Sequence, residues 1–311
     1  MINTVMPEML WESTDADVEL QRRFGFASVD AAAAWAEELL AEDYDLELTR
    51  LDRMVISAHN LMLWVTTAAA DRLMIKVCRL TEAHDWLSAR AALVQWLAEQ
   101  ELPVAAPLRT RSGDDQLLRD DSSIGVQPIL PGELLDATDL DQVRAAGSTL
   151  ATLHRQLAIW PDAVLLEDVQ PVAGSSTLWA YPDGRAETVP SELRRRLEQR
   201  IVDLPELSRQ PVHSDFRGAN VLYGDGEITG VIDFEEARLD AAVVDLAHAV
   251  CLLGTWYRNW QPITDRAQRL FLDSYTERRP LTDPEQVWLA PLVGWGMLGQ
   301  GWWEDAARWL R

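Results

Sequence analysis

Asp215, Asn220 and Asp233 are the residues of this sequence whose types and spacing best suit a chemical reaction. Transfer of a phosphoryl group needs magnesium ions that neutralise the phosphate oxygens, and magnesium prefers carboxylate and amide oxygens. Asp233 and Asn220 supply such oxygens, while the Asp215 carboxylate can orient an acceptor hydroxyl and accept its proton. Arg217 can direct a fixed cation toward the same place. Residues 213–234 are therefore predicted to form a magnesium-dependent phosphoryl-transfer centre.

A turn between two strands would also explain Asp215 and Asn220, because both residue types favour turns and Gly218 helps to form one. The segments on both sides are apolar: PV precedes the loop, VLY follows Asn220, and residues 228–232 read ITGVI. Such flanks favour buried strands that present a polar loop, which supports the catalytic interpretation over the plain turn. We interpret His213 as a brace of this loop through backbone hydrogen bonds rather than as a proton-transfer group.

These residues, with Asp240 and residues 244–247 (VDLA), resemble the catalytic segment of the aminoglycoside phosphotransferase and choline kinase superfamily, which is related to protein kinases. The resemblance follows the order of elements over most of the chain and is specific in residues 211–247. It implies an α+β, two-lobed, protein-kinase-like fold with a small N-lobe built on an antiparallel sheet and a larger, mostly helical C-lobe. The usual His-Gly-Asp reads His-Ser-Asp here, and we expect Ser214 to be tolerated because protein kinases also carry a larger residue there.

The resemblance implies ATP and Mg²⁺ as cofactors, with Asp215 and Arg217 as catalytic residues and Asn220 and Asp233 as metal ligands. Lys76, in the apolar segment LMIKV, sits where the family has the lysine that pairs with the α- and β-phosphates.

Family members usually carry a glutamate on the following helix that pairs with this lysine. That window holds Arg90, Ala91 and Ala92 here, whereas Glu82 and Asp85 come too early and Glu99 too late. The sequence thus predicts either that Lys76 is held differently or that activity is low.

The resemblance also implies which residues would contact the nucleotide, because they occupy the family's positions for these contacts. Pro128 and Leu130 occupy the places whose backbone carbonyl and amide would read the adenine edge, and a proline there keeps its carbonyl. Gln127 would lie at the back of the nucleotide pocket. Ser57 and Asn60, in the segment SAHN, replace the glycine-rich phosphate loop, although a plain hairpin turn explains them as well.

The elements that must position these residues follow from periodicity and capping signals. Residues 29–42 are rich in helix formers, with Ser28 or Asp30 as a cap, and residues 83–100 place apolar side chains at helical spacing. Strands are predicted at 46–56, 60–67 and 72–79, and further strands at 104–110 and 115–130 around a Ser-Gly-Asp-Asp turn.

Prolines and a glycine then punctuate residues 128–132, which predicts a hinge between an N-lobe at 1–127 and a C-lobe at 133–311. In the C-lobe we expect a helix at 139–157 capped by Thr138, then helices at 241–254, 263–277 and 284–309. Residues 161–190 are predicted to be a loop or substrate-side insertion. Seven tryptophans between Trp256 and Trp309 are expected to pack in the core, with Trp302 or Trp303 exposed because neighbours cannot share one helix face.

Composition bounds the remaining possibilities. The formal net charge of −22 disfavours nucleic acid as a partner and mildly favours a cationic or neutral one, although solubility explains it too. No apolar stretch approaches the roughly 18 residues that span a bilayer, so we expect no membrane contact and a cytoplasmic location. Cys78 and Cys251 lie in apolar runs and are predicted to be reduced core thiols.

The acceptor is ranked by class. First comes a hydroxyl of a small molecule, such as an aminoglycoside-like antibiotic, an amino sugar or an amine-containing metabolite, with Glu235 and Glu236 available to line a pocket for a cation. The second possibility is that the acceptor is a Ser or Thr of a peptide natural-product precursor, so that the protein is a peptide kinase. The third is a nucleotide-binding pseudokinase partner, for which the missing helix glutamate would have to be disabling.

Overall fold

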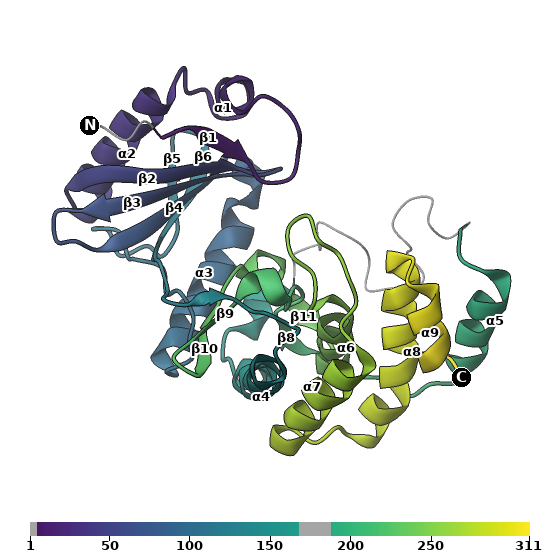
Figure 1. The fold of residues 1–311 in the computed structure, drawn as a ribbon. Helices are drawn as coiled ribbons and strands as arrows, with labels where there is room; N and C mark the ends of the chain where they lie inside the picture. The colour runs from purple at the N-terminus through teal and green to yellow at the C-terminus, as the bar shows by residue number, and fades with distance from the viewer. Residues whose placement is uncertain (1–4, 168–187) are drawn as a thin grey trace. The chain divides into compact units, whose positions relative to one another are not determined.

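The computed structural model describes residues 5–167 and 188–311, which form two compact units (Figure 1). The first unit ends at Leu130 and the second begins at Pro131. This division falls within residues 128–132; that these residues act as a hinge stays a prediction. No helix in the described ranges is long and apolar enough to cross a membrane.

The first unit is built on a six-stranded sheet in the order β1-β2-β3-β4-β6-β5. β1 pairs with β2 in parallel, and all other neighbours are antiparallel. The strands are β1 (Pro7–Met9), β2 (Leu48–Ile56), β3 (Asn60–Thr67), β4 (Arg72–Cys78), β5 (Leu117–Arg119) and β6 (Ser122–Pro128). Three helices accompany them: α1 (Ala16–Phe24), α2 (Val29–Tyr44) and α3 (His84–Glu99).

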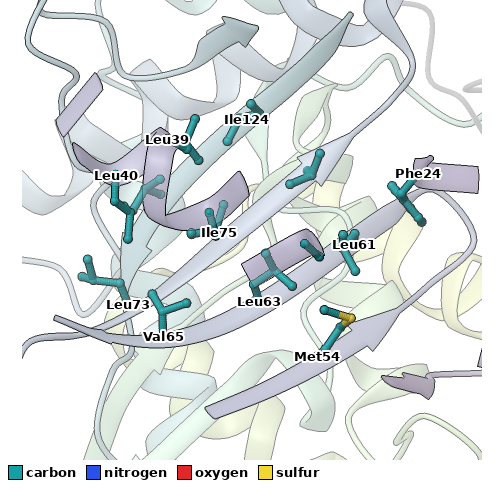
Figure 2. Close-up of a cluster of buried hydrophobic side chains, with 14 of the residues drawn as sticks. Phe24, Leu39, Leu40, Met54, Leu61, Leu63, Val65, Leu73, Ile75 and Ile124 are labelled. Carbon is teal, nitrogen blue, oxygen red and sulfur yellow. The ribbon is translucent and has the colours of Figure 1, made fainter. Parts of the chain in front are cut away.

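The core of the first unit lies between one face of this sheet and helices α1 and α2 (Figure 2). Side chains alternate along a strand, so β3 buries Leu61, Leu63 and Val65 on the same face. Leu39 and Leu40 of α2 are fully buried in the same cluster. This packing fixes the central strands, and with them the position of the residues on their opposite face.

The second unit combines short strands with helices. β9 (Val221–Gly224) lies between β10 (Glu227–Val231) and β7 (Glu133–Leu134), and β8 (Gln210–Val212) pairs with β11 (Arg238–Asp240). The helices are α4 (Leu140–Leu157), α5 (Ser191–Arg200), α6 (Ala242–Leu252), α7 (Asp265–Arg278), α8 (Asp283–Gln300) and α9 (Trp303–Trp309). α4 packs on α7, and α8 packs on both α6 and α9.

The strands predicted at 104–110 and 115–130 are wrong in part. Residues 104–110 form no strand, because Pro107 has no backbone N–H to donate. The segment is linked to β6 by a hydrogen bond from Leu108 N to Val126 O of 2.7 Å. A turn is present at Ser-Gly-Asp-Asp, as predicted, where Gly113 N donates to Thr110 O at 2.9 Å. The turn that joins two paired strands falls at Asp120 and Asp121, whose φ angles of 50° and 55° suit a two-residue hairpin.

Two helix boundaries also differ from expectation. The cap of α4 is Asp139, whose carboxylate accepts from the backbone of Asp141 at 2.9 Å, whereas Thr138 donates to Asp136. The helix expected at 284–309 divides into α8 and α9, because Gly301 adopts φ 79° and ends α8 in the left-handed region.

The expectations for the tryptophans and the cysteines can be compared with the burial of these side chains. The tryptophans from Trp256 onward are not core residues: Trp256, Trp260 and Trp303 are exposed and the others are half-buried. Trp303 is the exposed member of the adjacent pair, as predicted. Both cysteines are buried thiols that form no disulfide, as expected. Most of the segment predicted to be a loop, 161–190, lies outside the described residues.

Candidate functional site

The loop between β8 and β9 presents Asp215 with its two carboxylate oxygens in different states. Oδ2 accepts from Arg217 Nε at 3.0 Å and from Asn220 Nδ2 at 2.6 Å. Asn220 Nδ2 also donates to the backbone oxygen of Asp215 at 2.9 Å. Oδ1 accepts no hydrogen bond from the residues that the structure describes. The carboxylate is therefore fixed through one oxygen and open through the other, and its side chain is 21% exposed.

The geometry of Asn220 follows from the same contacts. Its amide nitrogen directs its hydrogens at Asp215, so its Oδ1 is turned away as an acceptor. Ile232 N donates to Asn220 O at 3.0 Å, which ties the end of β10 to the loop. Asp233 follows directly in a left-handed conformation, with φ 67°. The backbone thus links the two residues that the sequence nominated as metal ligands.

Ser214 holds a conformation that is unusual for a residue with a side chain. Its φ is 70°, its side chain is buried, and its Oγ makes no hydrogen bond in the described structure. Left-handed backbone suits glycine, which explains why the related pattern has glycine here. The backbone of Ser214 is held on both sides: its N–H donates to Asp245 Oδ1 at 2.9 Å, and its carbonyl accepts from His248 Nδ1 at 2.8 Å. That serine is tolerated here stays a prediction.

Asp245, on α6, anchors the loop from within the protein. It accepts from the backbone N–H groups of His213 and Ser214 and from His154 Nε2, at 2.9–3.0 Å. Burial alone would raise the pKa of this carboxyl. The hydrogen bond from His154 and the attraction of neighbouring histidines outweigh burial and lower the pKa to about 2. Asp245 therefore stays ionised while it holds the loop.

A chain of side chains extends this anchor to α7. His154 Nδ1 lies 2.7 Å from the hydroxyl of Tyr275, and both residues are fully buried. Because His154 donates through Nε2 to Asp245, its Nδ1 accepts a hydrogen bond from the hydroxyl of Tyr275. Arg279 lies beside Tyr275 and forms an ion pair with Glu285 at 2.7 Å. The loop of residues 213–220 is thus supported by α4, α6 and α7 together.

His213 has both ring nitrogens engaged with backbone groups. Nδ1 accepts from Asp215 N at 3.1 Å, so Nε2 carries the proton and donates to Ile232 O at 3.1 Å. Its ring also packs on Phe234, with centroids 4.5 Å apart. The prediction that His213 braces the loop is confirmed by these contacts.

Negatively charged side chains lie around the loop of residues 213–220. Burial raises the pKa of Glu236, and the nearby carboxylates of Asp215 and Asp233 raise it further. Among the described residues, no group of three or more His, Cys, Asp or Glu side chains is arranged to hold a metal ion. A site with one carboxylate and one amide oxygen is still typical of magnesium, which keeps waters and takes further ligands from phosphates.

Gly218 and two tryptophans pack behind Arg217. A Cβ on Gly218 would lie 2.7 Å from Leu253 O and 2.9 Å from Trp256 Nε1, so this position has room for glycine alone. The guanidinium of Arg217 lies 5.7 Å from the ring centre of Trp260 and its side chain is 8% exposed. Arg217 is therefore fixed in place before any ligand arrives.

The first unit carries the other predicted residues. Lys76 lies on β4 opposite Gly125 of β6, on the face that alternates with the buried Ile75 and Val77.

Arg90 lies in the middle of α3. It is buried, its Nη1 donates to Trp86 O at 3.1 Å, and its guanidinium lies 4.4 Å from the Trp86 ring centre.

Acids near this helix are peripheral. Glu82, Asp85 and Glu99 are all exposed. That none of them takes the place of the usual glutamate stays a prediction.

Ser57 and Asn60 close the hairpin between β2 and β3. Ser57 N donates to Asn60 O at 2.8 Å, and Asn60 N donates to Ser57 Oγ at 3.2 Å. Pro128 is the last residue of β6 and pairs with Leu73, and Leu130 follows at the end of the unit. Their roles toward a nucleotide remain predictions.

Sequence reasoning missed the supporting roles of His154 and Tyr275. Neither residue was singled out from the sequence, and Asp245 entered only within the segment 244–247 that carries the resemblance. A signal was present, because a charged residue in the apolar segment AVVDLAHAV must find buried partners. Which partners they are depends on helix packing that the sequence does not display.

Curated relatives with similar sequences are homoserine kinases. The chain is 28% identical to the homoserine kinase of Gluconobacter oxydans over 206 residues, which cover 64% of each protein. It is 29% identical to that of Methylobacillus flagellatus over 201 residues, 63% of this chain and 60% of the relative. The chain thus spans just under two thirds of the length of the curated relatives it matches.

Solved structures share the fold. An amicoumacin kinase in complex with AMP-PNP, Ca²⁺ and Ami superposes with a TM-score of 0.61 at 16% identity, covering 94% of this chain and 95% of that one. The macrolide 2′-phosphotransferase MphH from Brachybacterium faecium gives a TM-score of 0.60 at 18% identity, covering 89% and 97%. The model of the phosphotransferase enzyme family matches residues 54–282, which include Lys76 and residues 213–234. The chain therefore belongs to this phosphotransferase enzyme family and has the two-lobed, kinase-like fold of the aminoglycoside phosphotransferases.

Proposed function

We propose that the protein is an ATP-dependent phosphotransferase that moves the γ-phosphoryl group to a hydroxyl of a small molecule. The observation that carries this proposal is the state of Asp215, whose Oδ2 is held by Arg217 and Asn220 while Oδ1 is open. A carboxylate that is fixed on one side and open on the other suits a group that receives a proton from a substrate. Family membership and the homoserine kinase relatives support the same reaction class.

In the proposed reaction, the acceptor hydroxyl donates a hydrogen bond to Asp215 Oδ1. As the acceptor oxygen bonds to the γ-phosphorus, its proton passes to Oδ1, and the bond between the γ-phosphorus and the β–γ bridging oxygen breaks to leave ADP. Arg217 is held beside Asp215 by its hydrogen bond and by Trp260. Its fixed charge reduces the rearrangement needed when negative charge develops on the transferring group.

The residues present fit a divalent metal ion. Asn220 Oδ1 is turned away from Asp215, and the backbone bond from Ile232 N to Asn220 O holds this residue close to Asp233. These two oxygens would hold Mg²⁺, and the ion would neutralise the phosphate oxygens when bound. In the first unit, we assign Lys76 to the phosphates, Ser57 and Asn60 to the phosphate loop, and the backbone of Pro128 and Leu130 to the adenine.

For the acceptor we propose an amino alcohol. Asp215, Asp233, Glu235 and Glu236 concentrate negative charge near the loop of residues 213–220. Burial raises the pKa of Glu236, and the neighbouring carboxylates raise it further. Such a site favours an acceptor that carries an amine beside its hydroxyl. The relatives and neighbours include homoserine kinases and an aminopropanol kinase, which act on molecules of this kind by name.

A nucleotide-binding pseudokinase is the second candidate, and one observation favours it. Arg90 is buried on α3 in the register where a glutamate was expected. If this arrangement were disabling, the protein would bind MgATP and transfer nothing to any acceptor. The two candidates therefore separate by turnover rather than by binding.

The test is a phosphorylation screen read by mass spectrometry, with homoserine, aminopropanol, amino sugars, aminoglycosides, choline and Ser-containing peptides as acceptors. We expect a phosphate added to an amino alcohol, lost by at least about 10³-fold in Asp215→Asn. The matched control is Asp225→Asn, an exposed aspartate of the β9–β10 turn in the same unit. Turnover by Asp215→Asn at the control's rate would remove Asp215 as the proton acceptor, and MgATP binding without transfer would favour the pseudokinase.

A further inference from the structure

The N-terminal segment before the family region contacts the hairpin that joins β2 to β3. The family model begins at residue 54, whereas β1 and α1 lie within residues 7–24. β1 pairs in parallel with the end of β2, and Leu10 N donates to Ile56 O at 2.9 Å. The segment therefore reaches the residue that directly precedes the hairpin of residues 57–60.

Helix α1 is docked firmly enough to serve as a support. Leu20 and Phe24 are buried in the core of the first unit, and Phe24 is labelled in Figure 2. Gly25 ends the helix with φ 79°. Arg79, just after β4, donates from Nη1 to Phe24 O at 2.7 Å. The buried side chains, the helix end at Gly25 and the hydrogen bond from Arg79 together fix the position of Arg23, the residue before Phe24.

That residue is Arg23, and its guanidinium binds the hairpin backbone. Nη1 donates to Ser57 O at 3.1 Å and, more weakly, to Ala58 O at 3.5 Å. Nη2 donates to Glu12 at 2.8 Å, and Nε donates to Glu19. The side chain is only 17% exposed. Two carboxylates therefore aim the guanidinium, and the planar fork presents its remaining edge to the hairpin.

Two backbone N–H groups of the hairpin donate hydrogen bonds within the turn, and two others do not. Ser57 N and Asn60 N donate within the turn, whereas Ala58 N and His59 N donate to no group in the described structure. A trans peptide plane directs each carbonyl opposite to the N–H of the next residue. By holding the carbonyls of Ser57 and Ala58, Arg23 fixes the direction of the N–H groups of Ala58 and His59, away from itself.

We infer that Arg23 is a positioning residue that pre-forms the phosphate loop of this protein. Two neighbouring backbone N–H groups held in one direction are a binding element for an anionic oxygen. The ligand is the phosphate chain of the nucleotide, so the inference rests on the proposed function. The N-terminal segment, which lies outside the family region, thereby becomes part of the nucleotide-binding machinery.

The experiment compares full-length wild type, Arg23→Ala and Arg23→Lys by calorimetric titration with MgATP and with adenosine. We expect Arg23→Ala to weaken MgATP binding about tenfold, since the loop must then be ordered on binding. Adenosine has no phosphates, so its affinity should stay within about twofold of wild type. Arg23→Lys keeps a charge and loses the fork, so its loss should be intermediate.

The matched control is Arg22→Ala. Arg22 is the neighbouring, exposed arginine of α1, and it also pairs with Glu19 but does not contact the hairpin. It should leave both affinities unchanged. Hydrogen exchange gives a readout independent of ligand: the amides of Ser57 and Asn60 should exchange about tenfold faster in Arg23→Ala than in Arg22→Ala.

The outcomes are separable. If wild type binds MgATP and both Arg23 variants bind it with the same affinity, the inference is overturned and the proposed function stands. Equal loss of MgATP and adenosine affinity would show general damage to the unit and would also overturn it. Absence of MgATP binding in wild type would overturn the proposed function and the inference together. If Arg23→Ala does not fold, the intermediate effect of Arg23→Lys decides.

Discussion

Replacing Ser214 by glycine or alanine should stabilise the second unit, although substitutions at buried positions usually destabilise. Ser214 combines a φ of 70° with a buried hydroxyl that has no hydrogen-bond partner in the described structure. Both features cost free energy in the folded state. A left-handed residue with a side chain costs about 1–3 kcal/mol, and an unsatisfied buried polar group costs about 1–3 kcal/mol.

The two substitutions separate these costs. Ser214→Ala removes the hydroxyl and keeps Cβ, so we expect a gain of about 2 kcal/mol. Ser214→Gly also relieves the backbone. That relief is offset by the greater freedom of glycine in the unfolded chain, about 0.4–1 kcal/mol, and by loss of a buried methylene, about 0.8 kcal/mol. We therefore expect both variants to gain about 2 kcal/mol, with the hydroxyl as the main source.

Native-state hydrogen exchange measures this gain in the second unit alone. Amides of α6, which are buried and exchange through global opening, should slow about 30-fold for a gain of 2 kcal/mol. Asp225→Gly is the backbone control, because Asp225 has φ 53° in an exposed turn of the same unit and no buried hydroxyl. Aspartate tolerates the left-handed region better than most residues, so the small relief and the greater freedom of glycine should nearly cancel, within about 0.5 kcal/mol. Unchanged or faster exchange of α6 in Ser214→Ala would refute the reasoning.

Three further predictions concern the support of the loop. Gly218→Ala should cost about 1–3 kcal/mol in urea denaturation, because the new Cβ would lie 2.7 Å from Leu253 O. Glu236→Gln should leave stability unchanged below pH 4.5 and raise it increasingly above, measured without metal in the presence of a chelator. Burial and nearby carboxylates raise the pKa of Glu236 above 4.5, so wild type loses stability as the pH rises from that value through the raised pKa. Tyr275→Phe should cost about 1–2 kcal/mol by removing the partner of His154 Nδ1, and a urea midpoint equal to wild type would contradict this.

Much of the first unit could be predicted because its strands have plain periodicity. Residues 60–67 alternate buried and half-buried side chains, and the predicted bounds agree with β3. The helix predicted at 29–42 is present with Ser28 as its cap, extended to Tyr44. Both cases depend on local patterns, which a sequence displays directly.

The errors arose where tertiary contacts decide. β1 is three residues long and forms because its backbone pairs with the edge of β2, so no local pattern announces it. α1 has a good N-cap in Asp15, and its significance lies in Arg23, whose hairpin partners are distant in sequence. For the site, the sequence indicated Asp215, Asn220 and Asp233, but not the state of each oxygen, which depends on how the loop is hydrogen-bonded.

The two central aspartates of the second unit show how hydrogen bonding divides roles between like residues. Asp245 is fully buried, and its two oxygens together accept from two backbone N–H groups and from His154. These donors stabilise the carboxylate so strongly that its pKa falls to about 2, and no oxygen is left for a substrate. Asp215 has donors on Oδ2 alone, which leaves Oδ1 open toward the proposed acceptor hydroxyl. Asp245 fixes the backbone that carries Asp215, the residue that we propose receives the proton. Substitutions at the two positions should therefore impair different properties, stability at Asp245 and turnover at Asp215.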